Sequence, residues 1–191
     1  MELEAVILAA GFSSRAGTFK MELDFGGKGI LERCIEGFYD ICTQIYVVGG
    51  YQYEKVQRIT QRYSKVQMVY NSQYIKGMFS SVKEGVRQVK AERFFFTPGD
   101  YPLINQAVCM KMLEESGEII IPAFNGKKGH PVLMSGKLAK EIFQEAEDSN
   151  LKNFINRRGF TLVEVNDKGI LMDVDTMDDY YKLLGLRSDK S

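Results

Sequence analysis

Short apolar runs alternate along this chain with longer segments in which apolar residues recur at the spacing of a helix. Residues 30–41 and 82–89 are two such helical segments. The alternation is typical of an α/β protein, in which helices cover both faces of a mainly parallel sheet. The expected strands are residues 5–10, 45–48, 66–70, 93–97, 118–122, 131–134, 161–165 and 170–174.

The length of 191 residues suits one domain, because a chain of this size buries roughly 70% of its unfolded surface. No internal repeat or linker interrupts the sequence. We therefore expect a single Rossmann-like, three-layer α/β/α domain at residues 1–186, followed by a flexible tail at residues 187–191. Such sheets bind ligands beyond the carboxyl ends of their strands, so the loops at those ends are the places to look for a site.

Charge and cysteine content argue against several classes of protein. The 25 basic residues balance the 25 acidic ones, which indicates no general attraction to nucleic acid or to an anionic membrane. The first apolar run has acidic neighbours, unlike a secretory signal, and no segment reaches the roughly 18 apolar residues of a membrane span. Cys34, Cys42 and Cys109 include no Cys-x-x-Cys pair, which fits small core residues in a reducing cytoplasm.

The segment after the first strand, LAAGFSSRAGTFK at residues 8–20, combines small residues with two positive charges. Backbone N–H groups in such a turn can approach an anion closely, and the charges would neutralise it. The segment matches neither the Walker pattern nor the dinucleotide pattern. An ordinary strand-to-helix turn with solvated charges is the alternative. The small residues are Gly11, Ser13, Ser14 and Gly17, and the charges are Arg15 and Lys20.

Carboxylates follow two other apolar runs. Asp100 comes shortly after the run at 93–97, where it would face the same crevice as the opening loop and could bind Mg²⁺ through its oxygens. A Gly-Asp turn is the alternative for this residue. Asp173 and Asp175 alternate on an extended segment, so we expect only one of them to face a given site. Thr176 is expected to cap the helix that follows.

His130 is the only histidine of the chain and lies between Gly129 and Pro131. One histidine cannot form a zinc site with these cysteines, and no nucleophile elbow accompanies it. A rigid turn entering a strand, or a residue lining a substrate pocket, fits His130 better than a direct catalytic role.

Six segments in order resemble the MobA/MocA-like nucleotidyltransferases of molybdenum-cofactor maturation. LAAGFSSRAGTFK is followed by GKGILER, NSQYIKGMFSSVKEGV, PGDYPLI, GHPVLM and DVDTMDDY, and the resemblance covers essentially the whole chain. The first motif is shared with wider sugar and isoprenoid nucleotidyltransferases, whereas GHPVLM and the DxDT end narrow the resemblance. Ala16 stands where the family usually has methionine, and Pro98 and Tyr101 flank the Gly-Asp pair where the family more often has leucine and glutamine.

The resemblance implies Mg²⁺-dependent transfer of CMP from CTP to the phosphate of molybdopterin, with release of pyrophosphate. A phosphate nucleophile is ionised near neutral pH, so no general base is required. Lys20, Arg15 and Asp100 would be catalytic. Asp100 and Asp175 would hold the metal, with Asp173 as an alternative, and His130 and Tyr101 would bind the acceptor. The nucleotide would contact Leu8, Ala9, Ala10, Gly11, Ser13, Ser14, Arg15, Gly17, Lys20, Asn71, Gly77, Ser80, Ser81 and Gly99.

The nucleotide and the acceptor each have alternatives. The LAAG form resembles the cytidylyltransferase branch, and the methyl group of Ala10 would favour a pyrimidine by taking space beside the base. GTP, or a sugar or polyol phosphate as acceptor, would suit the same superfamily. A non-catalytic nucleotide-binding maturation factor for a molybdenum hydroxylase apoenzyme is a further alternative, and a dinucleotide-dependent oxidoreductase is the least favoured.

Overall fold

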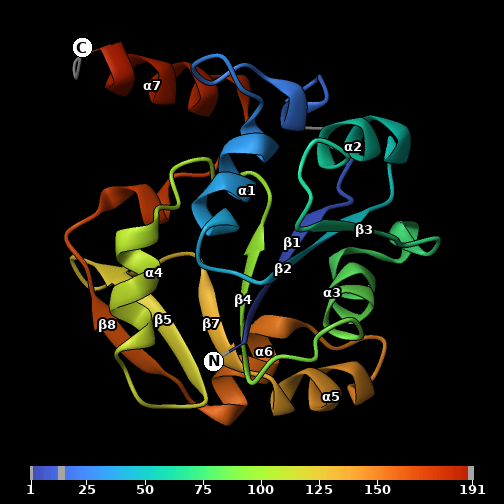
Figure 1. The fold of residues 1–191 in the computed structure, drawn as a ribbon, viewed down its shortest axis with the longest axis vertical. Helices are drawn as coiled ribbons and strands as arrows, with labels where there is room; N and C mark the ends of the chain where they lie inside the picture. The colour runs from blue at the N-terminus through green and yellow to red at the C-terminus, as the bar shows by residue number, and fades with distance from the viewer. Residues whose placement is uncertain (1, 13–15, 189–191) are drawn as a thin grey trace.

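A computed structural model describes residues 2–12 and 16–188, with side chains as far as residue 185. Its centre is one sheet of eight strands (Figure 1). The strands are β1 (Leu3–Ala9), β2 (Gln44–Gly49), β3 (Val66–Tyr70), β4 (Arg93–Pro98), β5 (Ile119–Phe124), β6 (Lys127–Lys128), β7 (Val132–Ser135) and β8 (Thr161–Glu164).

The sheet is mainly parallel, with an antiparallel part toward one edge. Its order is β3-β2-β1-β4-β7-β5-β6, and β8 pairs in parallel with β5. β1 lies between β2 and β4 and runs parallel to both. β7 is antiparallel to β4 and to β5. The carboxyl ends of β1, β2, β3 and β4 therefore meet at one edge of the sheet.

Helices cover both faces of the sheet, which confirms the α/β architecture expected from the sequence. The side chains of β1 alternate between the two faces: Ile7 joins one core cluster, and Val6 and Leu8 join the other. Helices α1 (Ile30–Tyr39), α2 (Tyr53–Thr60) and α4 (Gln106–Leu113) pack on the Ile7 face, and α3 (Met78–Val86), α5 (Lys137–Gln144) and α6 (Leu151–Arg158) pack on the other.

Helix α1 packs against the sheet as its sequence predicts. Ile30, Leu31, Cys34, Ile35 and Phe38 are fully buried, because their helical spacing places them on one side of α1. Figure 1 shows α1 lying against the sheet, with β1 and β4 behind it. Leu31, Cys34, Ile35 and Phe38 share a core cluster with residues of β1 and β4, so this helix positions the loops at the ends of those strands.

One expected strand is wrong. Residues 170–174 do not form a strand, because the short 3₁₀ helix η3 (Lys168–Leu171) covers the first part and irregular chain follows. The carboxylate of Asp167 accepts a hydrogen bond from Gly169 N–H and starts this helix. Beyond it, Val174 N–H donates to the carbonyl of Asp100 instead of to a neighbouring strand. β6 was not among the expected strands.

The last helix, α7 (Met177–Ser188), returns to the edge where the carboxyl ends of the parallel strands meet. Thr176 caps it as expected: its hydroxyl accepts from Asp179 N–H, and its own N–H donates to the Asp179 carboxylate. Figure 1 shows α7 beside the blue segment that follows β1, and Tyr180 donates a hydrogen bond there to the carbonyl of Asp24. The helix includes Arg187 and Ser188 of the expected tail, and residues 189–191 lie outside the described chain.

Candidate active site

Two loops are joined where β1 and β4 end. Gly99 N–H, just past β4, donates to the carbonyl of Leu8 over 2.8 Å. A side chain at Gly99 would meet Leu31 Cδ1 at 3.0 Å and the Leu8 carbonyl oxygen at 3.1 Å, so glycine permits this approach. The contact brings Asp100 next to the chain that leaves β1 at Ala10.

A cleft of about 280 Å³ opens at this junction and gathers much of the predicted nucleotide site. Its walls contain Leu8, Ala10, Gly11, Lys20, Gly77, Ser81, Asp100 and Asp175. The remaining predicted nucleotide residues that the structure describes lie in or beside the same elements but outside the cleft lining. They are Ala9, Gly17, Asn71, Ser80 and Gly99. Ser13, Ser14 and Arg15 lie outside the described residues.

Lys20 links the two sequence-distant carboxylates in the cleft. It begins the 3₁₀ helix η1 (Lys20–Glu22), and its Nζ lies 2.5 Å from Asp100 Oδ2 and 3.3 Å from Asp175 Oδ1. The side chains of Lys20 and Asp100 are each 11% exposed. At this depth the positive charge offsets carboxylates that would otherwise repel one another.

Asp173 also belongs to this group, which corrects the expectation that only one of Asp173 and Asp175 faces the site. Asp100, Asp173 and Asp175 each offer a carboxylate oxygen, and these oxygens lie within 4.8 Å of one another. Both aspartates reach Asp100 because Val174, between them, is fully buried and its N–H donates to the Asp100 carbonyl. The segment is irregular chain, so the strand alternation behind the expectation does not apply.

Burial, together with the charges of the acidic group, raises the pKa of Asp173 and of Tyr101. Burial raises the pKa of Asp173 above its ordinary value, and the charge of Asp100 adds to that increase. Burial also raises the pKa of Tyr101, with further contributions from the negative charges of Asp173 and Asp100. One atom is unsatisfied as well: Asp100 Oδ1 is buried and has no hydrogen-bond partner among the described residues. Three hard oxygen donors, one of them unpaired, suit a divalent cation.

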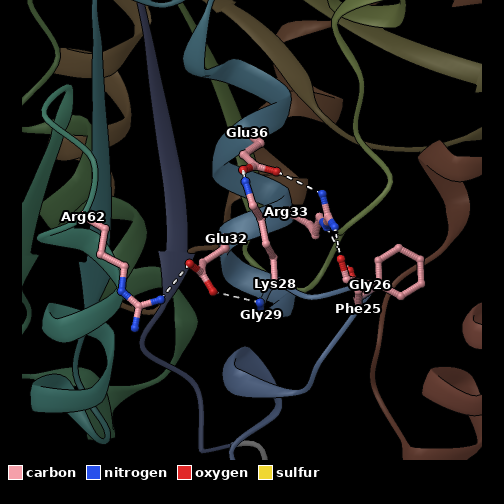
Figure 2. Close-up of polar contacts among 8 residues, drawn as sticks. All are labelled: Phe25, Gly26, Lys28, Gly29, Glu32, Arg33, Glu36 and Arg62. Carbon is pink, nitrogen blue, oxygen red and sulfur yellow. Dashed lines mark hydrogen bonds and ion pairs between the residues drawn. The ribbon is translucent and has the colours of Figure 1, made fainter.

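The segment between Lys20 and α1 is braced by polar contacts, which Figure 2 shows. Arg33 of α1 donates through Nε to the carbonyl of Phe25 over 2.9 Å and through its terminal nitrogen to the carbonyl of Gly26. Glu32 accepts from the N–H of Gly29 over 2.8 Å, and its other oxygen accepts from Arg62. The bonds to Phe25, Gly26 and Gly29 attach the turn that follows η1 to α1, a helix that packs in the core.

Asn71 forms hydrogen bonds that link the loop after β3 to the first turn of α3, next to the cleft. This residue follows β3 and is 1% exposed. Its amide donates to Ser80 Oγ over 2.8 Å and to Ser81 Oγ over 2.9 Å, and its oxygen accepts from the N–H of Gln73. Gly77 is the N-cap residue of α3 and has a φ of 102°, a conformation that favours glycine. Asn71 thus holds the turn that presents Ser81 and Gly77 to the cleft.

Tyr101 and His130 lie in a second cleft, of about 440 Å³, whose wall shares Met78 and Pro98 with the first. Their ring centroids are 4.6 Å apart. Burial lowers the pKa of His130 from 6.5 to about 4, although a hydrogen bond with the Phe96 backbone opposes the shift. The imidazole is therefore neutral near pH 7. The structure brings these two predicted acceptor residues together, beside the first cleft.

Several cleft residues were missed by the sequence analysis. Phe12 and Tyr74 line the first cleft, and their ring centroids are 5.5 Å apart. Phe12 also contacts Tyr51, with a centroid distance of 5.3 Å, so the opening loop packs on the loop after β2. Both Phe12 and Tyr51 lie just after strands in the sequence, which was the available signal. Met21, Met78 and Pro98 complete the lining.

Comparison with known proteins agrees with this geometry. Residues 5–162 match the model of the MobA-like NTP transferase domain. The chain belongs to the family of MobA-like NTP transferase domains. It is 31% identical over 180 residues to the molybdenum cofactor cytidylyltransferase of Escherichia coli (strain K12), covering 93% of each chain. A probable molybdenum cofactor guanylyltransferase of Methanosarcina acetivorans is 23% identical, over 95% of this chain and 89% of that protein.

Solved structures share the fold of this family member. A nucleotidyl transferase from Methanothermobacter superposes with a TM-score of 0.86 at 19% identity, over 100% of this chain and 99% of that one. The family match and the 31% identical relative show that the MobA-like chain is an enzyme of the nucleotidyltransferase type, and the solved structure agrees with its single α/β domain. Within its described residues, no helix has both the length and the apolar character needed to cross a membrane.

Proposed function

We propose that this protein transfers CMP from CTP to the phosphate group of a molybdopterin-type acceptor and releases pyrophosphate. The observation that carries the proposal is the Lys20 ammonium held between Asp100 and Asp175 at the joined ends of β1 and β4. A cation and carboxylates at this edge are what a site for a metal-bound triphosphate requires. The similarity to a cytidylyltransferase over 93% of the chain supports the choice of reaction.

The residues of the cleft would act by position and charge. The triphosphate would lie along the backbone that leaves β1 at Ala10 and Gly11, and Lys20 would neutralise its phosphates together with Arg15. The acceptor phosphate is already ionised near neutral pH, so it can attack without a general base. Holding the two phosphates in line and neutralising their charge then accounts for the catalysis.

Asp100, Asp173 and Asp175 would hold Mg²⁺. The fit rests on the buried Asp100 Oδ1, which has no hydrogen-bond partner among the residues that the structure describes, and on the three carboxylate oxygens within 4.8 Å of one another. When bound, the ion would offset negative charge on the phosphate oxygens. Lys20 now occupies the space beside these carboxylates, so its ammonium would have to move toward the phosphates as the ion enters.

Ala10 supports the choice of CTP over GTP. Its side chain is 7% exposed and lies in the cleft wall just past β1. A methyl group there takes space from a larger purine, although one methyl changes selectivity by only about 1–3 kcal/mol. GTP is the alternative, since the probable guanylyltransferase of Methanosarcina acetivorans is also a relative.

Pyrophosphate release tests the proposal directly. The full-length protein is incubated with Mg²⁺, molybdopterin and either CTP or GTP, and pyrophosphate is measured over time. We expect release with CTP, strong loss in Lys20→Ala, and unchanged release in the control Lys90→Gln. Lys90 is exposed and precedes β4, at the end opposite Asp100. Release that is unaffected by Lys20→Ala would contradict the role of Lys20.

Two further expectations belong to this proposal. A panel of sugar and polyol phosphates in the same assay separates a molybdopterin acceptor from the alternatives within the superfamily. Tight binding of nucleotide with no pyrophosphate release from any acceptor would favour a non-catalytic maturation factor. A molybdenum hydroxylase apoenzyme as partner and a cytoplasmic location stay predictions.

A further inference from the structure

The carboxylates of the first cleft are held by the fold in different ways. Asp100 follows β4 closely, and the Gly99 N–H that precedes it is bonded to the carbonyl of Leu8. Asp175 lies on irregular chain between η3 and α7. Its side chain is 32% exposed and its Oδ1 lies 3.3 Å from Lys20 Nζ, whereas Asp100 is 11% exposed and lies 2.5 Å from the same atom. The position of Asp175 therefore depends on what anchors the chain on either side of it.

Helix α7 anchors the chain after Asp175 to the segment that follows Lys20. Leu183 of this helix is 1% exposed. It belongs to a core cluster with Phe25, Ile30 and Val174. Because Phe25 follows η1, the cluster packs α7 against the chain that leads from Lys20 into α1. Figure 1 shows α7 beside that segment, which is drawn in blue.

One hydrogen bond fixes the first turns of α7 against the same segment. Tyr180 Oη donates to the carbonyl of Asp24 over 2.6 Å, across 156 residues of sequence. The backbone N–H of Tyr180 donates to the carbonyl of Thr176, so the ring is carried by the part of the helix that directly follows Asp175. Asp24 comes shortly after η1, which begins with Lys20. The bond therefore connects the two segments that carry Asp175 and Lys20.

We propose that Tyr180 is a positioning residue for the metal site: its bond to the Asp24 carbonyl holds α7, and through α7 the Asp175 carboxylate, where it faces Lys20. This inference rests on the proposed function, because it concerns a carboxylate assigned there to Mg²⁺. A site whose ligands are already fixed binds an ion more tightly than one whose ligands must be ordered on binding. Tyr180 is not part of the lining of the first cleft, so it acts through Asp175.

Mn²⁺ titration of the nucleotide-free, full-length protein tests the inference with the ion alone as the probe. Tyr180→Phe removes the hydroxyl and keeps the ring. We expect Mn²⁺ to bind roughly threefold to tenfold more weakly in this variant, the range for loss of one hydrogen bond.

The neighbouring Tyr181 offers a matched control. Its side chain is 60% exposed, and its ring contacts the ring of Tyr180 at a centroid distance of 5.6 Å. Tyr181→Phe makes the same chemical change on the same helix and should bind Mn²⁺ like wild type. Mn²⁺ affinity equal to wild type in Tyr180→Phe, or an equal loss in both variants, would overturn the proposal.

A double-mutant cycle separates positioning of Asp175 from a general loss of stability. Asp175→Ala alone should weaken Mn²⁺ binding by roughly tenfold or more, because one charged ligand is removed. Adding Tyr180→Phe to Asp175→Ala should cause no further loss, since the residue through which Tyr180 acts is gone. Urea unfolding of each variant shows that it is folded. A second loss as large as that of Tyr180→Phe in the wild-type background would refute positioning through Asp175.

The same measurements keep the two proposals distinct. If Asp175→Ala binds Mn²⁺ like wild type, the metal assignment of the proposed function fails, and the present inference fails with it. If Asp175→Ala weakens binding and Tyr180→Phe does not, only the present inference fails. If CTP and molybdopterin give no pyrophosphate but the Mn²⁺ affinities follow the expected order, the proposed reaction fails and the role of Tyr180 stands.

Discussion

The two clefts differ in the charge state and pairing of their buried polar groups. In the first, the Lys20 ammonium lies against Asp100 and Asp175, so two of the three clustered carboxylates contact a cation of the protein. In the second, burial keeps His130 neutral, and its buried Nδ1 has no hydrogen-bond partner within the part of the chain that the structure describes. The first cleft must therefore rearrange its ion pairs to admit a charged ligand, whereas the second holds a neutral imidazole.

The largest expected effect comes from Asp100→Asn, which removes a charge on which the first cleft depends. We expect the rate of pyrophosphate release to fall by on the order of 10²–10³-fold, as for loss of one well-placed electrostatic contact. Asp178→Asn is the control, because Asp178 is exposed in the first turn of α7. Equal rates in the two variants would show that Asp100 does not serve the reaction.

The pH dependence of stability tests the neutral state of His130. In the folded protein its pKa is lowered to about 4, from 6.5. Between pH 4 and pH 6.5, His130 binds a proton in the unfolded chain but not in the folded protein. Protonation therefore favours the unfolded chain, so the contribution of His130 to stability is fully present above pH 6.5 and is lost as the pH falls toward 4. The expected loss is about 3 kcal/mol in the free energy of unfolding.

Urea unfolding of wild type and His130→Phe at pH 7 and pH 4 measures this loss. Because all other titrating groups are common to the two proteins, the wild type should lose about 3 kcal/mol more than the variant on acidification. Parallel losses in both proteins would mean that His130 takes up its proton in the folded state as readily as in the unfolded chain.

Lys20→Met tests whether the lysine and a metal ion compete. The ammonium lies 2.5 Å from Asp100 Oδ2, in the space beside the carboxylates. Without it, we expect the nucleotide-free protein to bind Mn²⁺ about tenfold more tightly, a change of about 1.4 kcal/mol, measured by calorimetric titration. Lys90→Met, at an exposed position, should leave the affinity unchanged. If Lys20→Met binds Mn²⁺ no better than wild type, the competition is ruled out.

The smallest expected effect is that of Lys28→Ala. Lys28 pairs with Glu36 at the surface beside the segment that follows η1, and its side chain is 45% exposed. Figure 2 shows that Arg33, in contrast, reaches two backbone carbonyls. We expect Lys28→Ala to change the free energy of unfolding by less than about 1 kcal/mol. Arg33→Ala should cost more, about 2 kcal/mol, because two carbonyls lose their donor. Thermal unfolding of both variants checks the order.

Much of the fold and part of the site could be predicted because the signals were local. The apolar run at residues 5–10 and the helical spacing from Ile30 to Phe38 each reflect burial of a continuous segment. The run at residues 170–174 led to the wrong prediction of a strand, because its apolar residues are buried by contacts other than those of a sheet. Ile170 joins one core cluster, and Val174 packs with Phe25, Ile30 and Leu183 in another. Burial by itself does not distinguish a strand from irregular chain.

The sequence by itself determined the alternation of strands and helices, the small residues after β1, and the carboxylates and lysine from which a site could be built. Only the tertiary structure decided which of them meet. Lys20 contacts Asp100 and Asp175 across separations of 80 and 155 residues, and Asp173 joins them because Val174 is anchored to the Asp100 carbonyl. The adjacency of the two clefts and the burial of His130 likewise depend on packing between distant segments. Local pattern sets backbone conformation, whereas long-range contacts set the distances and burial on which charge and hydrogen bonding depend.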